Sequence, residues 1–500
     1  MYMMTRAWNR IHGNRALDYT PLPLTEKEPS SYTRTRRHVQ AHWLTAGRAV
    51  QVMAALFCVY GTIRLLSTFN PDPCDTIDKG YRCSPKTSHF WGQYSLWYAV
   101  PSDIDVAPPK GCQVTFANVL SRHGGRDPTM GKTIAYHLLI AEIQNTSTAY
   151  PGEFRFLKDY EYNLGADQLT EAGRQEMVNS GAHFYNRYRS LIQNNPPFVR
   201  AGGQERVVES AEKWLTGVAQ AQGKKAKEVH LIIPEGTKWN NTLSHDTCPA
   251  FVTGPSHGLG GRAMGTWASI FVPPIQERVN KALGTNLTQT SIIYLMDMCP
   301  FDTLANPKAK MSHFCRLFTG EEWRAYDYLQ SLGKYYGYGP GNPLAPTQGV
   351  GYVNELLARL TGLPVKDDTN TNRTLDSDPK TFPLDRKVYA DFSHDNDMSQ
   401  VLAALGLYNN TKPLSNTTIE STEDTNGYSA AWTVPFAARI YVEKLQCVQD
   451  NDDYVRIIVN DRVQPLEFCG GNKYGMCTLS DFVASQSFAR SSGNWGQCFE

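Results

Sequence analysis

Residues 120–129 (LSRHGGRDPT) place a histidine between two arginines, a set of side chains suited to phosphate chemistry. An apolar run leads into Arg122 and His123, and two glycines then let the backbone turn tightly enough for Arg126 to return to the same place. Planar guanidinium groups bind phosphoryl oxygens in pairs, and an imidazole held between them can attack phosphorus. A basic turn with an incidental histidine is the alternative, but the pattern favours His123 as a nucleophile.

A second segment, residues 392–397 (FSHDND), also follows an apolar run that is typical of a strand. His394 could hydrogen-bond a phosphoryl oxygen, and Asp395 could protonate the departing alkoxide, which is a poor leaving group without a proton. Alternatively, Asp395 or Asn396 caps the helix that follows. Both interpretations can hold together, with Asn396 as the cap and Asp395 as the acid.

A third candidate for phosphate binding is Arg200. It ends a short β-rich run and stands just before Gly202 and Gly203. On spacing alone, a surface arginine is the better interpretation of this position. We therefore predict a phosphate-binding role for Arg200 only in combination with the motifs around His123 and Asp395.

These segments share one arrangement, an apolar run followed by reactive side chains or by a helical pattern. The strand runs are 114–120, 198–199, 229–233 and 388–392, and helical spacing appears at 205–218 and 398–407. Units of this kind predict an α/β fold with a mostly parallel sheet flanked by helices, and reactive groups at the carboxyl edge of its strands. We assign residues 72–129, 166–254 and 336–500 to this catalytic domain. Residues 130–165 and 255–335 lack strand runs and predict a smaller helical cap, while 367–379 reads as a solvated loop.

The N-terminal part of the chain has a different composition. Residues 1–48 are polar and basic, and the apolar run 49–66 follows, interrupted by Arg64. As a helix this run spans about 27 Å, close to the roughly 30 Å of a membrane core. The preceding arginines favour a cytosolic N-terminus. We predict a disordered tail, a single-pass type II anchor and an extracellular catalytic domain, with a cleaved signal and secretion as the alternative.

The cysteines and the net charge indicate the cellular compartment and exclude some kinds of partner. Of eleven cysteines, ten lie beyond residue 70, together with six Asn-x-Ser/Thr acceptor sites. This combination predicts an oxidising, glycosylating compartment. No pair of cysteines has the two-to-four-residue spacing of a zinc site, so no metal or other cofactor is expected. The formal net charge of +1 argues against nucleic acid as a partner.

The RHGGRDP and HD motifs resemble those of the histidine acid phosphatases. From the first of the ten cysteines to the C-terminus the chain is similar to the fungal phytases of that family. The stretches that carry this resemblance are CDTIDKGYRC (74–83), WGQY (91–94), YLMDMCPFDT (294–303), PTQGVGYVNELLARLTG (346–362) and SFARSSGNW (487–495). The first 70 residues are not covered.

The resemblance implies a histidine phosphatase fold with a helical cap, and hydrolysis of the phosphomonoester phytate through a phosphohistidine. His123 would be the nucleophile and Asp395 the proton donor. The residues that would grip the scissile phosphate are Arg122, Arg126, Arg200 and His394, and those that would contact the rest of the substrate are Gln93, Tyr94, Thr129 and Lys334. The family's disulfide pattern would pair Cys74–Cys83, Cys112–Cys447, Cys248–Cys498, Cys299–Cys315 and Cys469–Cys477. We expect a monomer.

Several positions depart from the phytase pattern. Gly125 stands where alanine is usual, Asp127 where tyrosine is common, and Gly333 where a second lysine often lies beside Lys334; of a segment that is often lysine-rich only Lys132 remains. Fewer basic groups would weaken capture of a polyanion more than the chemistry itself. A broad-specificity acid phosphatase is therefore the nearest alternative. A phosphoglycerate mutase and a catalytically inactive membrane glycoprotein of the same fold are the others, and the intact catalytic set argues against the latter.

Overall fold

The computed structural model describes residues 84–306, 310–448 and 452–500. The predicted tail 1–48, the predicted anchor 49–66 and the predicted pair Cys74–Cys83 lie outside these residues. The described residues belong to one compact unit. Within the described residues, none of the helices combines the length and the apolar character needed to cross a membrane.

A single sheet runs through the middle of this unit, and its first half is parallel. Mostly apolar segments of the sequence form these strands. The two central ones, Phe198–Gly202 and Val388–Ser393, are buried throughout because helices cover both faces of the sheet. The parallel strands, in their order across the sheet, are β3 (Leu231–Ile233), β2 (Phe198–Gly202), β4 (Val388–Ser393) and β1 (Cys112–Arg122). All four were predicted as strand runs, so the α/β prediction is confirmed.

The second half of the sheet is antiparallel, and its strands were not among the predicted runs. It continues from β1 through β5 (Arg439–Cys447), β6 (Asp453–Val459) and β7 (Arg462–Val463), with β8 (Met476–Thr478) also paired to β6. Cys112 lies opposite Cys447 in the register of β1 and β5, and the two form a disulfide. This bridge ties the nucleophile-bearing strand to the antiparallel half.

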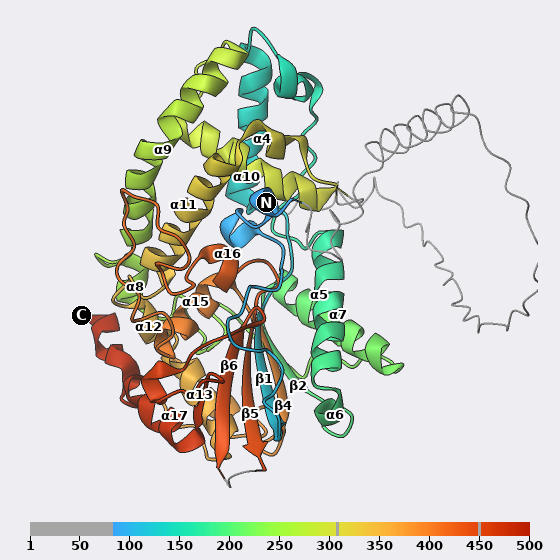
Figure 1. Ribbon diagram of the computed structural model, residues 1–500, viewed down its shortest axis with the longest axis vertical. Helices are drawn as coiled ribbons and strands as arrows, with labels where there is room; N and C mark the ends of the chain where they lie inside the picture. Colours follow the sequence, from blue (N-terminus) through green and yellow to red (C-terminus); the bar gives the residue numbers. More distant parts are fainter. Residues whose placement is uncertain (1–83, 307–309, 449–451) are drawn as a thin grey trace, which may run out of the picture. The chain divides into compact units, whose positions relative to one another are not determined.

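Helices cover the two faces of the sheet. Figure 1 shows α5 (Glu171–Arg187) and α7 (Glu205–Gln222) along one side of the strands and α13 (Val350–Thr361) along the other. Side chains alternate along a strand, so β1 contributes to a hydrophobic core on each face of the sheet. Ala117 and Val119 pack in the core beneath α5 and α7, and Phe116 and Leu120 pack in the core beneath α13. The strands therefore hold their ends rigidly between two packed layers.

A group of long helices lies beyond one end of the sheet (Figure 1). Its members are α4 (Met130–Thr146), α9 (Leu259–Leu283), α10 (Gln289–Ala305) and α11 (Gly320–Tyr338), with 3-10 turns at Gly152–Asp159 and His313–Leu317. Among the described residues of 130–165 and 255–335 there is no strand. The helical character predicted for these segments is therefore present, while their status as a separate cap domain stays a prediction.

The remaining elements are short. They are α3 (Pro85–Ser88), α6 (Arg189–Ile192), α8 (Pro249–Thr253), α12 (Ala345–Gln348), α14 (Arg373–Asp376), α15 (Asp395–Ala404), α16 (Ala430–Thr433), α17 (Leu479–Ser485), α18 (Ser487–Arg490) and 3-10 turns at Gly92–Tyr94, Glu467–Cys469 and Ser492–Phe499. The helical turn α14 interrupts the loop predicted at 367–379.

Four disulfides close this part of the chain. They are Cys112–Cys447, Cys248–Cys498, Cys299–Cys315 and Cys469–Cys477. These four pairings are the ones that the family resemblance implied, and they are confirmed. Two of them join residues 250 and 335 positions apart, and closing such long loops restricts the unfolded chain strongly.

Candidate active site

His123 lies at the end of β1, where the parallel strand β4 ends beside it. The register pairs Arg122 with Ser393, and the backbone N–H of His123 donates to the carbonyl oxygen of Ser393 over 3.1 Å. The two motifs are about 270 positions apart in sequence, and parallel pairing brings them to the same edge of the sheet. The convergence that the sequence analysis expected is therefore present.

The imidazole of His123 is held in one tautomer. Its Nδ1 atom lies 2.8 Å from the carbonyl oxygen of Gly124, and because a carbonyl only accepts, Nδ1 carries the proton and Nε2 keeps its lone pair. The side chain is buried, and burial together with the positive charges of Arg122 and Arg206 lowers the pKa of His123 well below its usual value. Neutral imidazole with a free Nε2 is the form that can act as a nucleophile.

The turn after His123 is packed against the start of α5. A Cβ atom at Gly124 would lie 2.4 Å from the carbonyl oxygen of Gly173, so no larger residue fits there without a shift of the backbone. The Glu176 carboxylate accepts from the N–H of Gly125 over 3.0 Å and from that of Trp97 over 2.7 Å. Helix α5 therefore fixes the path of the loop, a role that the sequence analysis did not predict for Glu176.

Arg122 is fully buried beside the nucleophile. Its Nη1 donates to the carbonyl oxygens of Gln93 and Val434, its Nη2 lies 3.2 Å from Asp395 Oδ2, and its guanidinium carbon lies 4.4 Å from the centre of the Phe436 ring. Burial and the neighbouring charge of Arg126 lower the pKa of Arg122 to about 10. The site therefore holds positive charges close together in a setting that favours an anionic ligand.

Asp395 is the first residue of α15 and faces two cations. Its Oδ2 lies 3.2 Å from Arg122 Nη2 and 2.7 Å from Lys334 Nζ, while its Oδ1 accepts from the backbone N–H of Asn396 over 3.1 Å. Burial would raise the pKa of Asp395, but the charges of Arg122 and Lys334 outweigh burial and hold the pKa well below its usual value. The N-cap of α15 is His394, so neither Asp395 nor Asn396 occupies the capping position that was the alternative interpretation.

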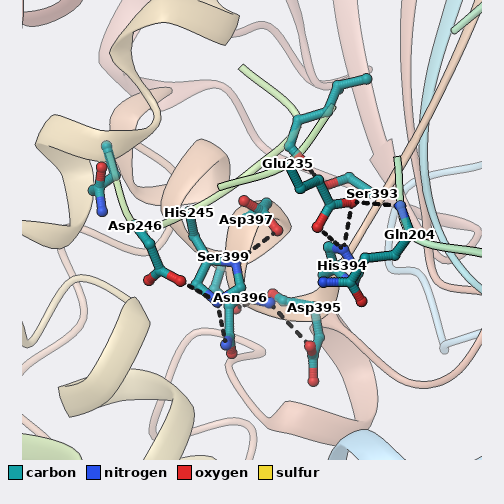
Figure 2. Close-up of polar contacts among 12 residues, drawn as sticks. Gln204, Glu235, His245, Asp246, Ser393, His394, Asp395, Asn396, Asp397 and Ser399 are labelled. Atoms are coloured by element: carbon teal, nitrogen blue, oxygen red, sulfur yellow. Dashed lines mark hydrogen bonds and ion pairs between the residues drawn. The ribbon is translucent and has the colours of Figure 1, made fainter. Parts of the chain in front are cut away.

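His394 stands between the nucleophile and a glutamate. Its ring centre lies 5.6 Å from that of His123, and its Nε2 lies 3.1 Å from both carboxylate oxygens of Glu235 (Figure 2). Burial opposes ionisation of Glu235, but the hydrogen bond and charge of His394 outweigh it and lower the pKa of that carboxyl. With Nε2 engaged, Nδ1 is the nitrogen of His394 available to a ligand. Glu235 follows the end of β3, and the sequence analysis assigned no reactive residue to that strand end.

A buried histidine, clustered cations and a carboxyl group at one sheet edge agree with the comparisons to known proteins. The family model of the histidine phosphatase superfamily, branch 2, matches residues 113–460. This chain is a branch 2 histidine phosphatase. Phytase A of Aspergillus oryzae is 51% identical over 439 residues, covering 85% of this chain and 94% of the relative. Phytase A of Aspergillus fumigatus is 48% identical over 461 residues, covering 90% and 98%.

Solved structures show the same fold at low sequence identity. The phytase from D. castellii superposes with a TM-score of 0.66 at 22% identity, covering 83% of this chain and 87% of its own. The multiple inositol polyphosphate phosphatase of Bifidobacterium longum, in complex with inositol hexasulfate, superposes with a TM-score of 0.58 at 13% identity, covering 80% and 98%. These similarities support the histidine phosphatase fold that the sequence predicted.

The position of Arg200 in this histidine phosphatase contradicts its predicted role. Its side chain is buried in β2, with Nη2 2.6 Å from Glu355 and Nε 2.8 Å from Asp391. Arg359 pairs with the same Asp391 over 2.5 Å. Side chains alternate along a strand, and the side chain of Arg200 points into a polar network beneath the sheet edge. Its guanidinium group is therefore already bound by two carboxylates. Arg200 is therefore a structural residue, and the prediction was wrong.

Arg206 is an arginine near His123 that the sequence analysis did not single out. It lies in the first turn of α7, directly after β2, and its charge is among the causes that lower the pKa of His123. Burial and the charge of Arg126 lower the pKa of Arg206 itself, and its nearest carboxylate, on Asp167, is 3.8 Å away. The signal was present in the sequence, because Arg206 follows a strand run at the start of a predicted helix.

Paired substitutions separate these two arginines. Arg200→Ala should lower the free energy of unfolding by about 3–5 kcal/mol, because it leaves the buried carboxylate of Glu355 without its cation and leaves Asp391 with Arg359 alone. Arg206→Ala should cost under about 1 kcal/mol, since its charge is not matched by a close partner, yet it should lower kcat/KM about a hundredfold or more. Urea unfolding and steady-state kinetics on both variants check this pattern, and the reverse pattern would restore Arg200 to the site.

The four predicted substrate contacts are placed differently from one another. Lys334 is buried and pairs directly with Asp395. Gln93 is buried and donates to Gln330 through its side chain, while its carbonyl oxygen receives Arg122. Tyr94 packs among Phe301 and Phe436 and under Lys132, and Thr129 is the exposed N-cap of α4. Of the four, Lys334 alone has a side-chain contact with the predicted acid among the described residues.

Proposed function

We propose that this histidine phosphatase hydrolyses phytate through a phosphohistidine formed on His123, with Asp395 as the proton donor. One observation carries the proposal: a buried imidazole with a free Nε2 lies among several cations and one carboxyl group. The cations that would hold the phosphate are Arg122, Arg126, Arg206 and His394. The substrate class is supported by phytase A relatives that are about half identical over most of both chains.

The reaction follows from this geometry in two steps. In the first, the Nε2 lone pair of His123 forms a bond to phosphorus, the bond to the ester oxygen breaks, and Asp395 gives its proton to that oxygen. In the second, Asp395 removes a proton from water, the water oxygen bonds to phosphorus, and the phosphorus–nitrogen bond breaks to release inorganic phosphate. The proton returns to Asp395, so each turnover consumes one water and restores the enzyme.

The charge state of Asp395 sets the direction of the pH dependence. In the free protein Arg122 and Lys334 keep this carboxyl ionised. A bound phosphate draws on the same two cations, which weakens their hold on the carboxylate and raises its pKa toward the range where it can carry a proton. Because the protonated fraction of Asp395 falls as the pH rises, we infer an acidic optimum.

Lys334→Met tests this link. Removing one of the two cations should raise the pKa of Asp395, so that the falling limb of the kcat/KM profile moves to higher pH. The KM for phytate should rise at the same time, since the variant loses a positive charge. The measurement is kcat/KM across about pH 3–8. A limb that stays in place, or moves to lower pH, would separate Lys334 from the acid.

A broad-specificity acid phosphatase is the second candidate, and one observation favours it. Lys132, the basic residue that remains in the usually lysine-rich segment, is paired with Asp297 over 2.6 Å, so its charge is already neutralised. Comparing kcat/KM for phytate with that for a simple phosphomonoester such as p-nitrophenyl phosphate distinguishes the two functions. A clear preference for phytate supports the first, and equal values support the second.

Trapping the intermediate tests the reaction itself. The enzyme is mixed with phytate labelled with ³²P and quenched in alkali, because a phosphorus–nitrogen bond on histidine withstands alkali and is lost in acid. We expect label on the protein that disappears on acid treatment and maps to His123. No label under single-turnover conditions, or label that resists acid, would rule out a phosphohistidine.

The cellular location is inferred from the disulfides and the acceptor sites. Four disulfides among the described residues, together with six Asn-x-Ser/Thr sites, support folding in an oxidising compartment and a catalytic domain outside the cytosol. Secretion and a type II anchor both satisfy these observations. The anchor at 49–66 remains a prediction.

A further inference from the structure

His245 lies next to the catalytic groups but has no part in the steps above. It belongs to the segment between β3 and α8, which the Cys248–Cys498 disulfide holds in place. About a quarter of its side chain, 23%, is exposed. Figure 2 shows its ring directed at the first turn of α15, toward Asn396 and Asp397.

A chain of polar contacts joins this imidazole to the predicted acid. His245 Nδ1 lies 3.1 Å from Asp397 Oδ2, and His245 Nε2 lies 3.2 Å from Asn396 Nδ2. On its other side, Asn396 Oδ1 accepts from Lys334 Nζ over 2.6 Å. The same Nζ atom lies 2.7 Å from Asp395 Oδ2. Asn396 therefore stands between two cationic or potentially cationic side chains, His245 and Lys334.

The amide of Asn396 directs its oxygen at Lys334 and its NH₂ group at His245, so in this orientation the oxygen does not accept from both neighbours. In the arrangement drawn, Asn396 donates to Nε2, which requires a neutral His245 with its proton on Nδ1 toward Asp397. A protonated His245 carries N–H groups on both nitrogens, so Asn396 must turn its oxygen toward the ring. Lys334 then faces the NH₂ group of Asn396 and loses the amide oxygen as an acceptor, which leaves it with Asp395. The two arrangements exclude each other.

Three carboxylates and two titratable rings lie around His245. Asp397 and Asp395 face it from α15, Asp246 Oδ2 lies 3.8 Å from Nε2 on its own segment, and the ring centres of Tyr338 and His394 lie 5.9 and 6.1 Å away. Burial opposes the charged form, but Asp397, Asp246 and Asp395 outweigh it and raise the pKa of His245 to about 9. The protonated arrangement is thus the one that holds at acidic pH.

We propose that His245 is a positioning residue whose protonation, acting through the amide of Asn396, releases Lys334 to bind the phosphate groups of the substrate. When His245 is neutral, Asn396 keeps Lys334 beside Asp395. When His245 is charged, Lys334 is bound by Asp395 alone, and an incoming phosphate competes with one partner instead of two. The inference rests on the role proposed above for Lys334 as a substrate contact.

Ligand binding must report on this coupling apart from the chemical step. Inositol hexasulfate is a suitable probe, because its sulfate groups stay fully ionised across the pH range and any pH dependence belongs to the protein. Its Kd is measured by calorimetry between about pH 4.5 and 9.5 for the wild type, His245→Gln, Lys334→Met and the double variant. Glutamine keeps a polar group near Asn396 but cannot become charged, so Lys334 stays held.

We expect His245→Gln to weaken binding about tenfold at pH 5, within the range typical of coupled sites. The difference from the wild type should close as the pH passes about 9, where His245 loses its proton. In the Lys334→Met background the same substitution should change Kd less than about threefold, since the group that it acts on is gone. Equal factors in the two backgrounds would overturn the proposal.

Two further variants guard against a purely structural effect. Asn396→Ala removes the shared amide and should also uncouple His245 from Lys334, so a coupling that survives it would overturn the proposal. His183→Gln is the matched control, since His183 pairs with Asp461 and packs on Trp97, and it should leave Kd unchanged. If Lys334→Met alone leaves Kd unchanged, the substrate role of Lys334 fails and this inference with it. The phosphoenzyme experiment decides the proposed function separately.

Discussion

Replacing His123 with alanine should lower turnover of phytate by at least about a thousandfold, because it removes the nitrogen that forms the bond to phosphorus in the proposed reaction. The fold should survive the change. Apart from its backbone, His123 is held by a local hydrogen bond to Gly124, so the loss in the free energy of unfolding should stay under about 2 kcal/mol. Single-turnover kinetics and thermal unfolding measure the two effects.

A matched histidine controls for non-specific damage. His313 is exposed and stacks on Phe156 in the helical region, so His313→Ala should keep full activity. Residual turnover of His123→Ala within about tenfold of the wild type would remove His123 from its role. Loss of the folded state would leave kinetics uninterpretable, so His123→Asn, which keeps a polar group near Gly124, serves as a second variant with the same expected loss.

Replacing Asp395 with asparagine should lower kcat on phytate by about a hundredfold to ten-thousandfold, the usual contribution of a positioned acid. The loss should depend on the leaving group. An inositol alkoxide needs a proton as it departs, whereas p-nitrophenolate is stable without one. With p-nitrophenyl phosphate the formation of the phosphoenzyme should therefore slow by less than about tenfold. Rapid-quench measurement of that step with both substrates checks the prediction.

The leaving-group comparison distinguishes acid catalysis from charge balance. Asp395 also neutralises Arg122 and Lys334, so its removal changes the field in the site. A change in the field alone would slow both substrates by the same factor. Equal losses on the two substrates would contradict the assignment of Asp395 as the proton donor while leaving His123 as the nucleophile.

The geometry explains why the site is charged in this way. Asp395 holds two cations in position before substrate arrives, and burial makes each of these charges costly to leave unmatched. In the proposed reaction, a phosphate that enters takes over the cations and leaves the carboxyl free to gain a proton. The ion pairs that position Arg122 and Lys334 would thus also prepare Asp395 for its step.

Most of the candidate site could be predicted from the sequence because its residues follow strand runs directly. β1 ends at Arg122 and β4 at Ser393, and a strand that ends in a motif delivers that motif to the sheet edge. The antiparallel strands β5–β8 were missed. The buried side chains of Arg439 and Glu443 break the apolar pattern of β5. Glu443 pairs with Arg187 and Arg456, and Arg439 lies over the Trp97 ring, so the partners of both come from other parts of the fold.

Arg200 shows where local sequence fails. It lies two residues before a glycine pair, as a loop residue would. Whether it can contact a ligand depends on whether its side chain points out of the sheet edge or beneath it. Glu355 and Asp391, the two carboxylates that pair with it, come from elements 155 and 191 positions away. The sequence around Arg200 contains no sign of either. Arg206 has no carboxylate so close, and it is the arginine that remains for a ligand.

The sequence by itself determined the parallel strand runs, the candidate catalytic residues His123 and Asp395, and the family to which the chain belongs, because each of these depends on neighbours in the chain. Only the tertiary structure decided that Arg200 pairs with buried carboxylates, which nitrogen of His123 faces Gly124, and how Asn396 is shared between His245 and Lys334. The physical reason is that hydrogen bonds and ion pairs act over a few ångströms in space. Their partners are distant in sequence, so no local pattern records them.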